Sequence, residues 1–400
     1  MRAGPAAALA AALIAFLGAG LWLGGHPGDL PGPLQDVFVD ETAALSGEAA
    51  EIIEDTYYRE VPRSRLNDGS VEGMVDALRR HNGEDRFSHY FDPEQAQLLE
   101  EQTEGRFSGV GLSVTEVRRG LKVIEVFEDS PAAKAGIRPD DVIVSVNGES
   151  IAGQSSQLST AKIKGPAGTE VTLGVRRPSS GETRQVRIER QEIRTPVVES
   201  SLRTVDSQSL GHLRLLGFSQ GAHGALREAV QRLRRRGAGG IVLDLRGNPG
   251  GLLTEAVLTA SVFLPESSKV VTTKSRAEGG RVYRAQGDPV PRRPMVVLID
   301  RNTASAAEIL ASALADHGLA EVVGTRSFGK GLFQHVVGLS NGGELDLSVG
   351  KFFTADGISL APKGIKPDVR ASDRPQTEAD EGLRRALAVL EAEVAGRTGG

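Results

Sequence analysis

Apolar runs alternate with amphipathic stretches through the second half of the chain, and this alternation limits the fold more than any other feature. The strand-like runs cover residues 211–215, 241–245 and 295–299, and the helical stretches cover 222–235, 252–263 and 306–315. Strands that alternate with helices of this length are typical of α/β folds. The sequence therefore predicts an α/β core from Ile193 onward.

The chain has 400 residues, which is too long for one ordinary core, and we expect two or three domains. Its net charge of -5, with both signs interspersed, argues against nucleic acid as the main partner. A short basic run of Arg232, Arg234, Arg235 and Arg236 fits the end of a helix, where cations interact favourably with the dipole.

A charge-free segment, Pro5 to Gly25, follows a single Arg2 near the N-terminus. Its length fits a membrane anchor slightly better than a cleaved export signal, and both alternatives stay open. In either case we expect the body of the protein outside the cytoplasm. The absence of cysteine excludes disulfides, zinc-thiolate sites and a lipid-modified cysteine.

Five segments are expected along the chain. Helical periodicity marks residues 43–99, short β-like runs separated by Gly and Pro mark 105–192, and two strands at 332–337 and 344–353 precede a helix over 377–394. The predicted boundaries are 1–25 for the signal or anchor, 26–104 for a linker and helical domain, 105–192 for a β domain, 193–372 for the α/β core and 373–400 for a C-terminal helix and tail.

Ser305 lies in Arg301-Asn-Thr-Ala-Ser-Ala-Ala-Glu308, which follows an apolar strand and opens a helix. Such a turn exposes a hydroxyl beside free backbone N–H groups. A structural interpretation competes, because Ser305 and Glu308 also have the spacing of a capping box. The two roles are compatible, since a helix start also points amides at a developing oxyanion.

Lys330, in Ser327-Phe-Gly-Lys-Gly, is the candidate base, because none of the seven histidines stands in a suitable motif. A lysine base must be neutral near pH 7, which needs its pKa lowered by about 3 units through burial. The segment also resembles a phosphate loop, Gly324-x4-Gly329-Lys330, but Gly331 replaces the magnesium-binding Ser or Thr. A predicted strand, not a helix, follows, so nucleotide binding is not expected.

The strand over 241–245 leads into Arg246-Gly-Asn-Pro-Gly-Gly251. This turn is similar to the nucleophile loop of chymotrypsin-like proteases, but Pro249 replaces the serine. Gly250 and Gly251 offer unobstructed amides that suit an oxyanion hole, although a plain tight turn is an equally good interpretation. The pair Ser159 and Lys162 lacks the companion motifs of penicillin-binding enzymes and is attributed to chance.

The β domain resembles a PDZ domain. The resemblance rests on Gly109-Val-Gly-Leu112, Ser130-Pro-Ala-Ala-Lys-Ala-Gly-Ile137, Asp140-Asp-Val-Ile-Val-Ser-Val-Asn-Gly148 and Gly165-Pro-Ala-Gly168. The loop of Gly109, Val110, Gly111 and Leu112 can offer N–H groups to a C-terminal carboxylate, and the strand after it can pair with a peptide.

With these segments in this order, the chain resembles the C-terminal processing peptidases, also called tail-specific proteases, from about residue 52 to 369. The resemblance implies that Ser305 is the nucleophile, Lys330 the general base and Gln334 the residue that orients the lysine. It places the oxyanion hole at the amide of Ala306 and at a glycine of Gly250-Gly251. The implied core is similar to crotonase and to Clp protease subunits.

Asp316 aligns with an aspartate once assigned to the charge relay, and a structural role is favoured because Ser/Lys enzymes need no acid. The family implies protein or peptide substrates bound by their C-termini, no cofactor and no metal, and the oligomeric state stays open. Two other functions are weighed: a catalytically silent PDZ scaffold and a crotonase-like acyl-transfer enzyme. The intact Ser305, Lys330 and Gln334 count against the scaffold.

Overall fold

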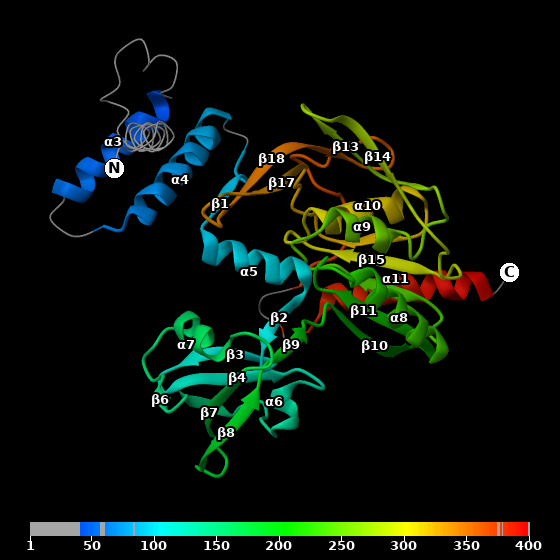
Figure 1. Cartoon of the computed structure of the whole chain (residues 1–400). Helices are drawn as coiled ribbons and strands as arrows, with labels where there is room; N and C mark the ends of the chain where they lie inside the picture. The colour runs from blue at the N-terminus through cyan, green and yellow to red at the C-terminus, as the bar shows by residue number, and fades with distance from the viewer. Residues whose placement is uncertain (1–40, 57–60, 83–84, 374–376, 378, 399–400) are drawn as a thin grey trace, which may run out of the picture. The chain divides into compact units, whose positions relative to one another are not determined.

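The computed structural model describes residues 41–56, 61–82, 85–373, 377 and 379–398 (Figure 1). The chain divides into two compact units, residues 1–92 and 93–400, which are described separately. The apolar segment predicted over residues 5–25 lies outside the described residues. Within the described part, no helix is both long enough and apolar enough to cross a membrane.

The described residues of the first unit form α3 (Glu41–Thr56), α4 (Arg63–Asn82) and the short strand β1 (His89–Phe91). Arg63 at the start of α4 forms an ion pair with Glu54 of α3 at 2.8 Å. The Tyr90 hydroxyl donates to the Asp68 carboxylate at 2.7 Å, which ties β1 to α4. The helical periodicity predicted here is confirmed, although β1 interrupts it before the next helix.

The β domain of the second unit is a twisted antiparallel sheet with two short helices. Its strands follow the order β3-β4-β5-β7-β8, with β6 paired to β5. The bounds are β3 (Leu112–Val117), β4 (Gly120–Val126), α6 (Pro131–Lys134), β5 (Val142–Val146), β6 (Glu149–Ser150), α7 (Ser156–Ile163), β7 (Glu170–Arg176) and β8 (Thr183–Glu189). The β-like character predicted for residues 105–192 is confirmed, and the two short helices α6 and α7 lie among the strands.

Two antiparallel strands, β2 (Arg106–Gly109) and β9 (Gln191–Arg194), carry the chain into and out of this domain. The helix α5 (Pro93–Glu104) precedes β2. The domain has its own core, in which Leu121, Ile143 and Leu173 are fully buried.

The α/β core is built on a sheet of order β10-β11-β12-β15-β16-β19, in which β10 is antiparallel and the other strands are parallel. The bounds are β10 (Val198–Val205), β11 (Gln208–Leu215), α8 (Ala222–Arg235), β12 (Ile241–Asp244), α9 (Leu253–Ala260), β15 (Met295–Ile299), α10 (Ala306–Asp316), β16 (Glu321–Gly324), β19 (Val369–Arg370) and α11 (Glu381–Thr398). Each residue of β12 and β15 is buried, as expected for a sheet that is covered on both faces.

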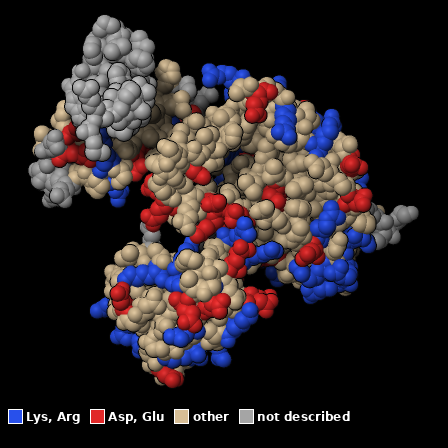
Figure 2. Space-filling view, viewed as in Figure 1, with Lys and Arg blue, Asp and Glu red and all other residues tan. Residues whose placement is uncertain are grey.

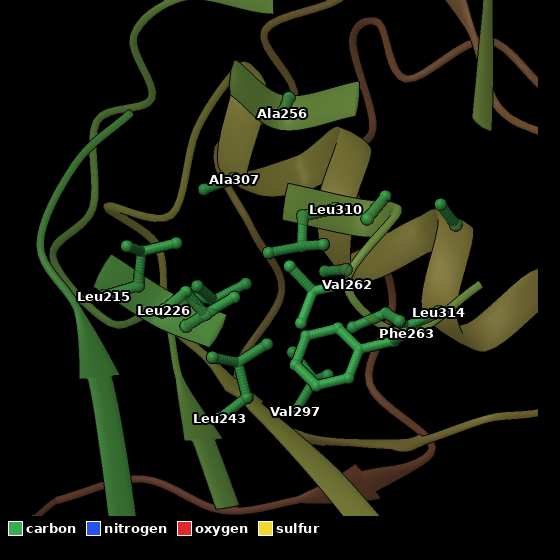
Figure 3. Packing of buried hydrophobic residues seen from close by; sticks show 14 of the residues in the cluster. Leu215, Leu226, Leu243, Ala256, Val262, Phe263, Val297, Ala307, Leu310 and Leu314 are labelled. Atoms are coloured by element: carbon green, nitrogen blue, oxygen red, sulfur yellow. The ribbon is translucent and has the colours of Figure 1, made fainter. Parts of the chain in front are cut away.

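Helices cover both faces of this sheet. Leu226 of α8, Ala256 of α9 and Leu310 of α10 pack with Leu243 and Val297 on one face (Figure 3). On the other face, α11 contributes apolar side chains that pack against the sheet residues Leu210, Val242, Leu298 and Val323. The predicted α/β core is therefore a three-layer structure.

A second antiparallel sheet of the same unit runs in the order β17-β18-β13-β14. Its strands are β13 (Lys269–Ser275), β14 (Gly279–Arg284), β17 (Leu332–Gly338) and β18 (Glu344–Phe353). The strand predicted directly after Lys330 is confirmed as β17. The C-terminal helix begins at Glu381 rather than at residue 377, since the Asp380 carboxylate accepts the N–H of Leu383 and caps the helix there.

Acidic and basic side chains are interspersed over the face of the described residues seen in Figure 2. Basic residues do gather at the end of α8, as predicted from the arginine run, with Arg232, Arg234 and Arg235 in its last turn.

Candidate active site

Two loops that follow neighbouring parallel strands form the candidate site. Residues 246–251 follow β12, and residues 300–305 follow β15, so both loops lie at the carboxyl edge of the sheet. Hydrogen bonds join them: the N–H of Gly247 donates to the Asp300 carboxylate at 3.0 Å, and the N–H of Ala304 donates to the Asn248 carbonyl at 3.0 Å. The sequence therefore brings the glycine turn and the Ser305 turn together.

Ser305 has an unusual backbone conformation at the start of α10, with φ 55° and ψ -120°. A non-glycine residue with positive φ is strained by about 1–3 kcal/mol and persists only where the surroundings hold it. A sharp, strained strand-to-helix turn is the geometry that presents a nucleophilic serine in other hydrolase folds. This conformation is a second indication, independent of the motif, that Ser305 has a chemical role.

Glu308 ties the Ser305 turn to the lysine loop. Its carboxylate, fully buried, accepts the N–H groups of Ser305 and Lys330 at 2.9 Å each and that of Gly329 at 2.8 Å. The Ser327 hydroxyl adds a fourth hydrogen bond at 2.5 Å. The predicted pairing of Glu308 with the Ser305 N–H is present, and one side chain fixes both candidate catalytic segments.

Burial lowers the pKa of the Lys330 ammonium below its usual value, because the charged form is poorly solvated there. The negative charges of Asp346 and Glu308 act in the opposite direction and raise it. The net direction is the one that a lysine base requires.

Gln334 lies on β17, two residues into the strand that begins just after the lysine loop. Its side-chain amide donates to the Ser348 hydroxyl on β18 at 3.3 Å. The role of Gln334 in orienting Lys330 stays a prediction that rests on the family resemblance.

We call residues 246–251 the oxyanion turn, after the role predicted for its glycines. The backbone amides of Gly250 and Gly251 in this turn are not equivalent. The N–H of Gly250 donates to the Asn248 side-chain oxygen at 2.9 Å, so this amide is already engaged. The neighbouring backbone bonds are the Phe218 N–H to the Gly250 carbonyl and the Leu252 N–H to the Phe218 carbonyl, and neither uses the amide of Gly251. Of the two predicted oxyanion donors, the amide of Gly251 is therefore the more available one, and the oxyanion role of either glycine stays a prediction.

Gly250 has a different role, which depends on its missing side chain. A Cβ atom at position 250 would lie 2.8 Å from the Cβ of Ser305 and 3.0 Å from the nitrogen of Ala306. Gly250 also has a positive φ of 105°. Only glycine lets this turn pack directly against Ser305 and the amide of Ala306.

Asp316 is at the far end of α10. Eleven residues at 1.5 Å per residue place it about 16 Å along the helix from Ser305. Burial raises the pKa of its carboxyl group, and the carboxylate accepts the N–H of Asp356 at 3.2 Å. This geometry favours the structural interpretation of Asp316.

The PDZ-like domain has a groove between β3 and α7. A cavity of about 180 Å³ is lined by Phe107, Gly109, Val110, Leu112, Val114, Thr160, Ile163 and Lys164. The predicted loop of Gly109, Val110 and Leu112 thus borders an apolar groove next to a strand edge. Gly111 itself is buried, has φ 82° and packs against Ser130, where a Cβ would lie 2.3 Å from the serine Cβ.

A larger cavity of about 530 Å³ reaches the oxyanion turn and is lined by residues of α5, β2 and the core. Phe107 and Lys164 border both this cavity and the PDZ groove. Pro249, Gly250 and Gly251 lie at its other side. An extended peptide chain bound in the groove therefore has an adjoining space that leads to the candidate site.

Sequence reasoning missed two residues of this site. It assigned Glu308 only a capping role, and the second role depends on a loop 22 residues away that no local pattern connects to it. Asn248, fully buried, donates to the Leu215 carbonyl at 2.8 Å and accepts the N–H of Gly250. In the sequence, the signal for Asn248 was its position between Gly247 and Pro249.

Comparison with known proteins identifies both domains of this part of the chain. The model of peptidase family S41 matches residues 209–371, and the PDZ domain model matches residues 108–189. The carboxy-terminal processing protease CtpA of Bacillus subtilis (strain 168) is 34% identical over 324 residues, which cover 81% of this chain and 68% of the relative. CtpB of the same organism is 31% identical over 373 residues, which cover 91% and 76%.

A solved structure from Bacteroides fragilis NCTC 9343, described as an S41 protease, superposes with a TM-score of 0.52 at 18% identity, covering 80% of this chain and 90% of that chain. This likeness concerns the fold alone. The identities to the processing proteases carry the assignment of the family. The chain therefore belongs to the carboxy-terminal processing proteases of peptidase family S41, and it is a serine peptidase with a PDZ domain.

Proposed function

We propose that this peptidase is exported, cleaves proteins with a Ser305/Lys330 pair and selects them by their C-terminal ends through the PDZ domain. The observation that carries the proposal is the buried carboxylate of Glu308, which accepts the backbone N–H groups of both Ser305 and Lys330. A single rigid anchor for two segments is what a nucleophile and its base need, since catalysis depends on their geometry.

In the proposed reaction the neutral amine of Lys330 takes the hydroxyl proton of Ser305 as the oxygen attacks the scissile carbonyl. The amides of Ala306 and Gly251 stabilise the negative oxygen of the tetrahedral intermediate. Lys330 then gives the proton to the leaving amine, and an acyl-enzyme on Ser305 remains. Water, deprotonated by Lys330, releases the product in a second cycle through the same site.

Substrate choice by the C-terminus is supported by the groove between β3 and α7. Its lining is mostly apolar and includes Val110 and Leu112 of the loop and Ile163 of α7. An extended peptide can add to the edge of β3, and the loop amides can receive its terminal carboxylate. We expect a preference for apolar residues at the last position of the substrate.

Export is proposed from the charge-free segment Pro5 to Gly25 after Arg2, which carries the features of a signal or an anchor. Fractionation of cells that express the full-length protein tests this point. We expect the protein on the outer side of the cytoplasmic membrane, and a full-length protein in the cytoplasm would contradict export.

Two alternatives considered from the sequence lose support. A catalytically silent scaffold and a crotonase-like acyl-transfer enzyme both disagree with membership in a protease family. The direct experiment is incubation of the purified protein with a loosely folded protein, followed by mass spectrometry of the fragments. We expect fragments with the wild type and none with Ser305→Ala, and the absence of fragments in both would contradict the proposal.

A further inference from the structure

Arg246 is the first residue of the oxyanion turn, directly after Leu245. Every N–H group of its side chain donates a hydrogen bond. The side chain has five N–H donors. The Nε–H and one N–H of Nη2 donate to the two carboxylate oxygens of Asp244, at 3.0 and 2.7 Å. The remaining three go to Asp373 at 3.0 Å and to the two oxygens of Asp380 at 2.9 Å each.

The two distant carboxylates belong to the start of the C-terminal helix α11. Asp380 accepts the N–H of Leu383 at 2.7 Å, and Asp373 accepts the N–H of Gly382 at 2.9 Å. Each carboxylate therefore binds the first turn of α11 and the loop arginine at the same time. We call Asp373 and Asp380 the acidic pair. Both lie beyond residue 371, where the match to the peptidase family ends.

The helix itself does not need the acidic pair to dock. Four side chains of α11 are buried against the sheet: Leu383, Ala386, Leu387 and Leu390. In Figure 1 this helix, drawn in red, lies along the strands of the six-stranded sheet, and it contacts β15 and β16. The apolar face accounts for docking, so the bonds to Arg246 are available for another purpose.

Arg246 stands directly before the groups that shape the oxyanion turn. Its own backbone N–H donates to Asp244 at 3.1 Å, and the next N–H, of Gly247, donates to Asp300 in the serine loop. Asn248 then holds the amide of Gly250. A shift of the arginine side chain would therefore move the beginning of a short loop whose later residues contact Ser305.

Electrostatics favours this arrangement. Burial opposes ionisation of Asp244, but hydrogen bonds from His212 and Arg246 lower its pKa to about 2. Burial likewise opposes ionisation of Asp380, but the hydrogen bond from Arg246 lowers its pKa. The Arg246 side chain is 18% exposed, whereas those of Asp373 and Asp380 are 48% and 45% exposed. Salt can therefore screen the outer half of the cluster more easily than the Asp244 half.

We propose that Asp373 and Asp380 are positioning residues for the peptidase: through Arg246 they hold the loop of Gly250 and Gly251 in its active geometry. This inference rests on the proposed Ser305/Lys330 reaction. Neither residue of the acidic pair lines the PDZ groove or the cavity beside it, so we expect an effect on the rate of the chemical step and none on substrate binding in the groove.

The test is the full-length double variant Asp373→Asn/Asp380→Asn, assayed by kcat and KM on a loosely folded protein. Asparagine is as good an N-cap as aspartate, so the variant keeps the cap of α11 and loses the charges toward Arg246. The matched control is Glu170→Gln, which removes an exposed ion pair with Arg187 between β7 and β8 of the PDZ domain, 3.6 Å long. Circular dichroism checks that each variant is folded, and active-site titration counts the active sites. Each kcat can then be given per folded molecule.

We expect kcat of the double variant to fall about tenfold at unchanged KM, while the control keeps the wild-type values. Added salt, at about 1 M, should lower kcat of the wild type toward that of the double variant and leave the variant unchanged. Wild-type kcat in the folded double variant, or an equal salt effect on both proteins, would overturn the inference. If the wild type itself cleaves nothing, the proposed function fails instead, so the two failures are distinct.

Discussion

The carboxylate of Glu308 accepts the backbone N–H of Lys330 at 2.9 Å, across 22 residues of sequence. Because the same carboxylate also accepts the N–H of Ser305, the relative position of the two segments is set by one buried side chain. All four of its partners are donors, which makes a carboxylate the only group of this size that can accept from each of them.

Glu308→Gln tests this anchor. The amide NH2 of glutamine would face donors and leave buried N–H groups unpaired, so the free energy of unfolding should fall by about 2–5 kcal/mol. We expect kcat per folded molecule to fall at least about 100-fold, measured after active-site titration. Ser327→Ala is the control, because it removes one donor of the cluster and keeps the bonds to Ser305 and Lys330. Equal kcat losses in the two variants would contradict the anchoring role.

The pH dependence should follow the charge on Lys330. The neutral amine is the active form, so kcat/KM should rise with pH through the pKa of Lys330, which burial lowers. The charge of Asp346 raises this pKa, and Asp346→Asn should therefore lower it further. We expect the acidic limb of the pH profile to move to lower pH in Asp346→Asn. Glu344→Gln, on the same strand, is the control, and a shift toward higher pH would contradict the assignment.

Gly250→Ala tests the close approach of the oxyanion turn to the nucleophile. The added Cβ would lie 2.8 Å from that of Ser305, and φ at this position is 105°. We expect a loss of about 2–4 kcal/mol in stability and at least a 100-fold loss in kcat. Gly357→Ala is the matched control, because its φ is 82° but the space around it is open. A similar kcat for both variants would show that the contact with Ser305 is unimportant.

Recognition by the PDZ groove predicts an effect of the substrate terminus on KM alone. Amidation removes the carboxylate that the loop of Gly109 to Leu112 is expected to bind. For a peptide with an apolar last residue we expect KM to rise about tenfold on amidation, with kcat unchanged. The control is a peptide of the same sequence that ends in aspartate, on which amidation should change little. An unchanged KM for the apolar peptide would show that the groove does not take part in recognising the substrate.

Much of the fold could be predicted from sequence because the central strands are apolar on both faces. The runs at 241–245 and 295–299 lie where periodicity placed them, as do the helices α8 before them, α9 between them and α10 after them. The strands β13 and β14 could not be predicted, since β14 is almost wholly exposed and carries no apolar alternation. The strand β16 is only four residues long, too short for periodicity to show.

The site was predictable in its residues but not in its connections. The motif around Ser305 and the lysine loop could be found locally, because strand, turn and helix signals surround each of them. The engagement of the Gly250 amide by Asn248, and the bonds of Arg246 to Asp373 and Asp380, join residues through space. Only the folded chain brings these partners together.

We propose that an uncharged Lys330 activates Ser305, and the variant Lys330→Arg is a direct test. Arginine has a side chain of similar length and is also a basic residue, but its guanidinium stays protonated at any working pH. The measurement is kcat/KM of the full-length variant on a loosely folded protein, beside Ser305→Ala, with circular dichroism to confirm the fold. We expect Lys330→Arg to be folded and as inactive as Ser305→Ala, whereas a folded variant that keeps most of its activity would contradict the Ser/Lys mechanism.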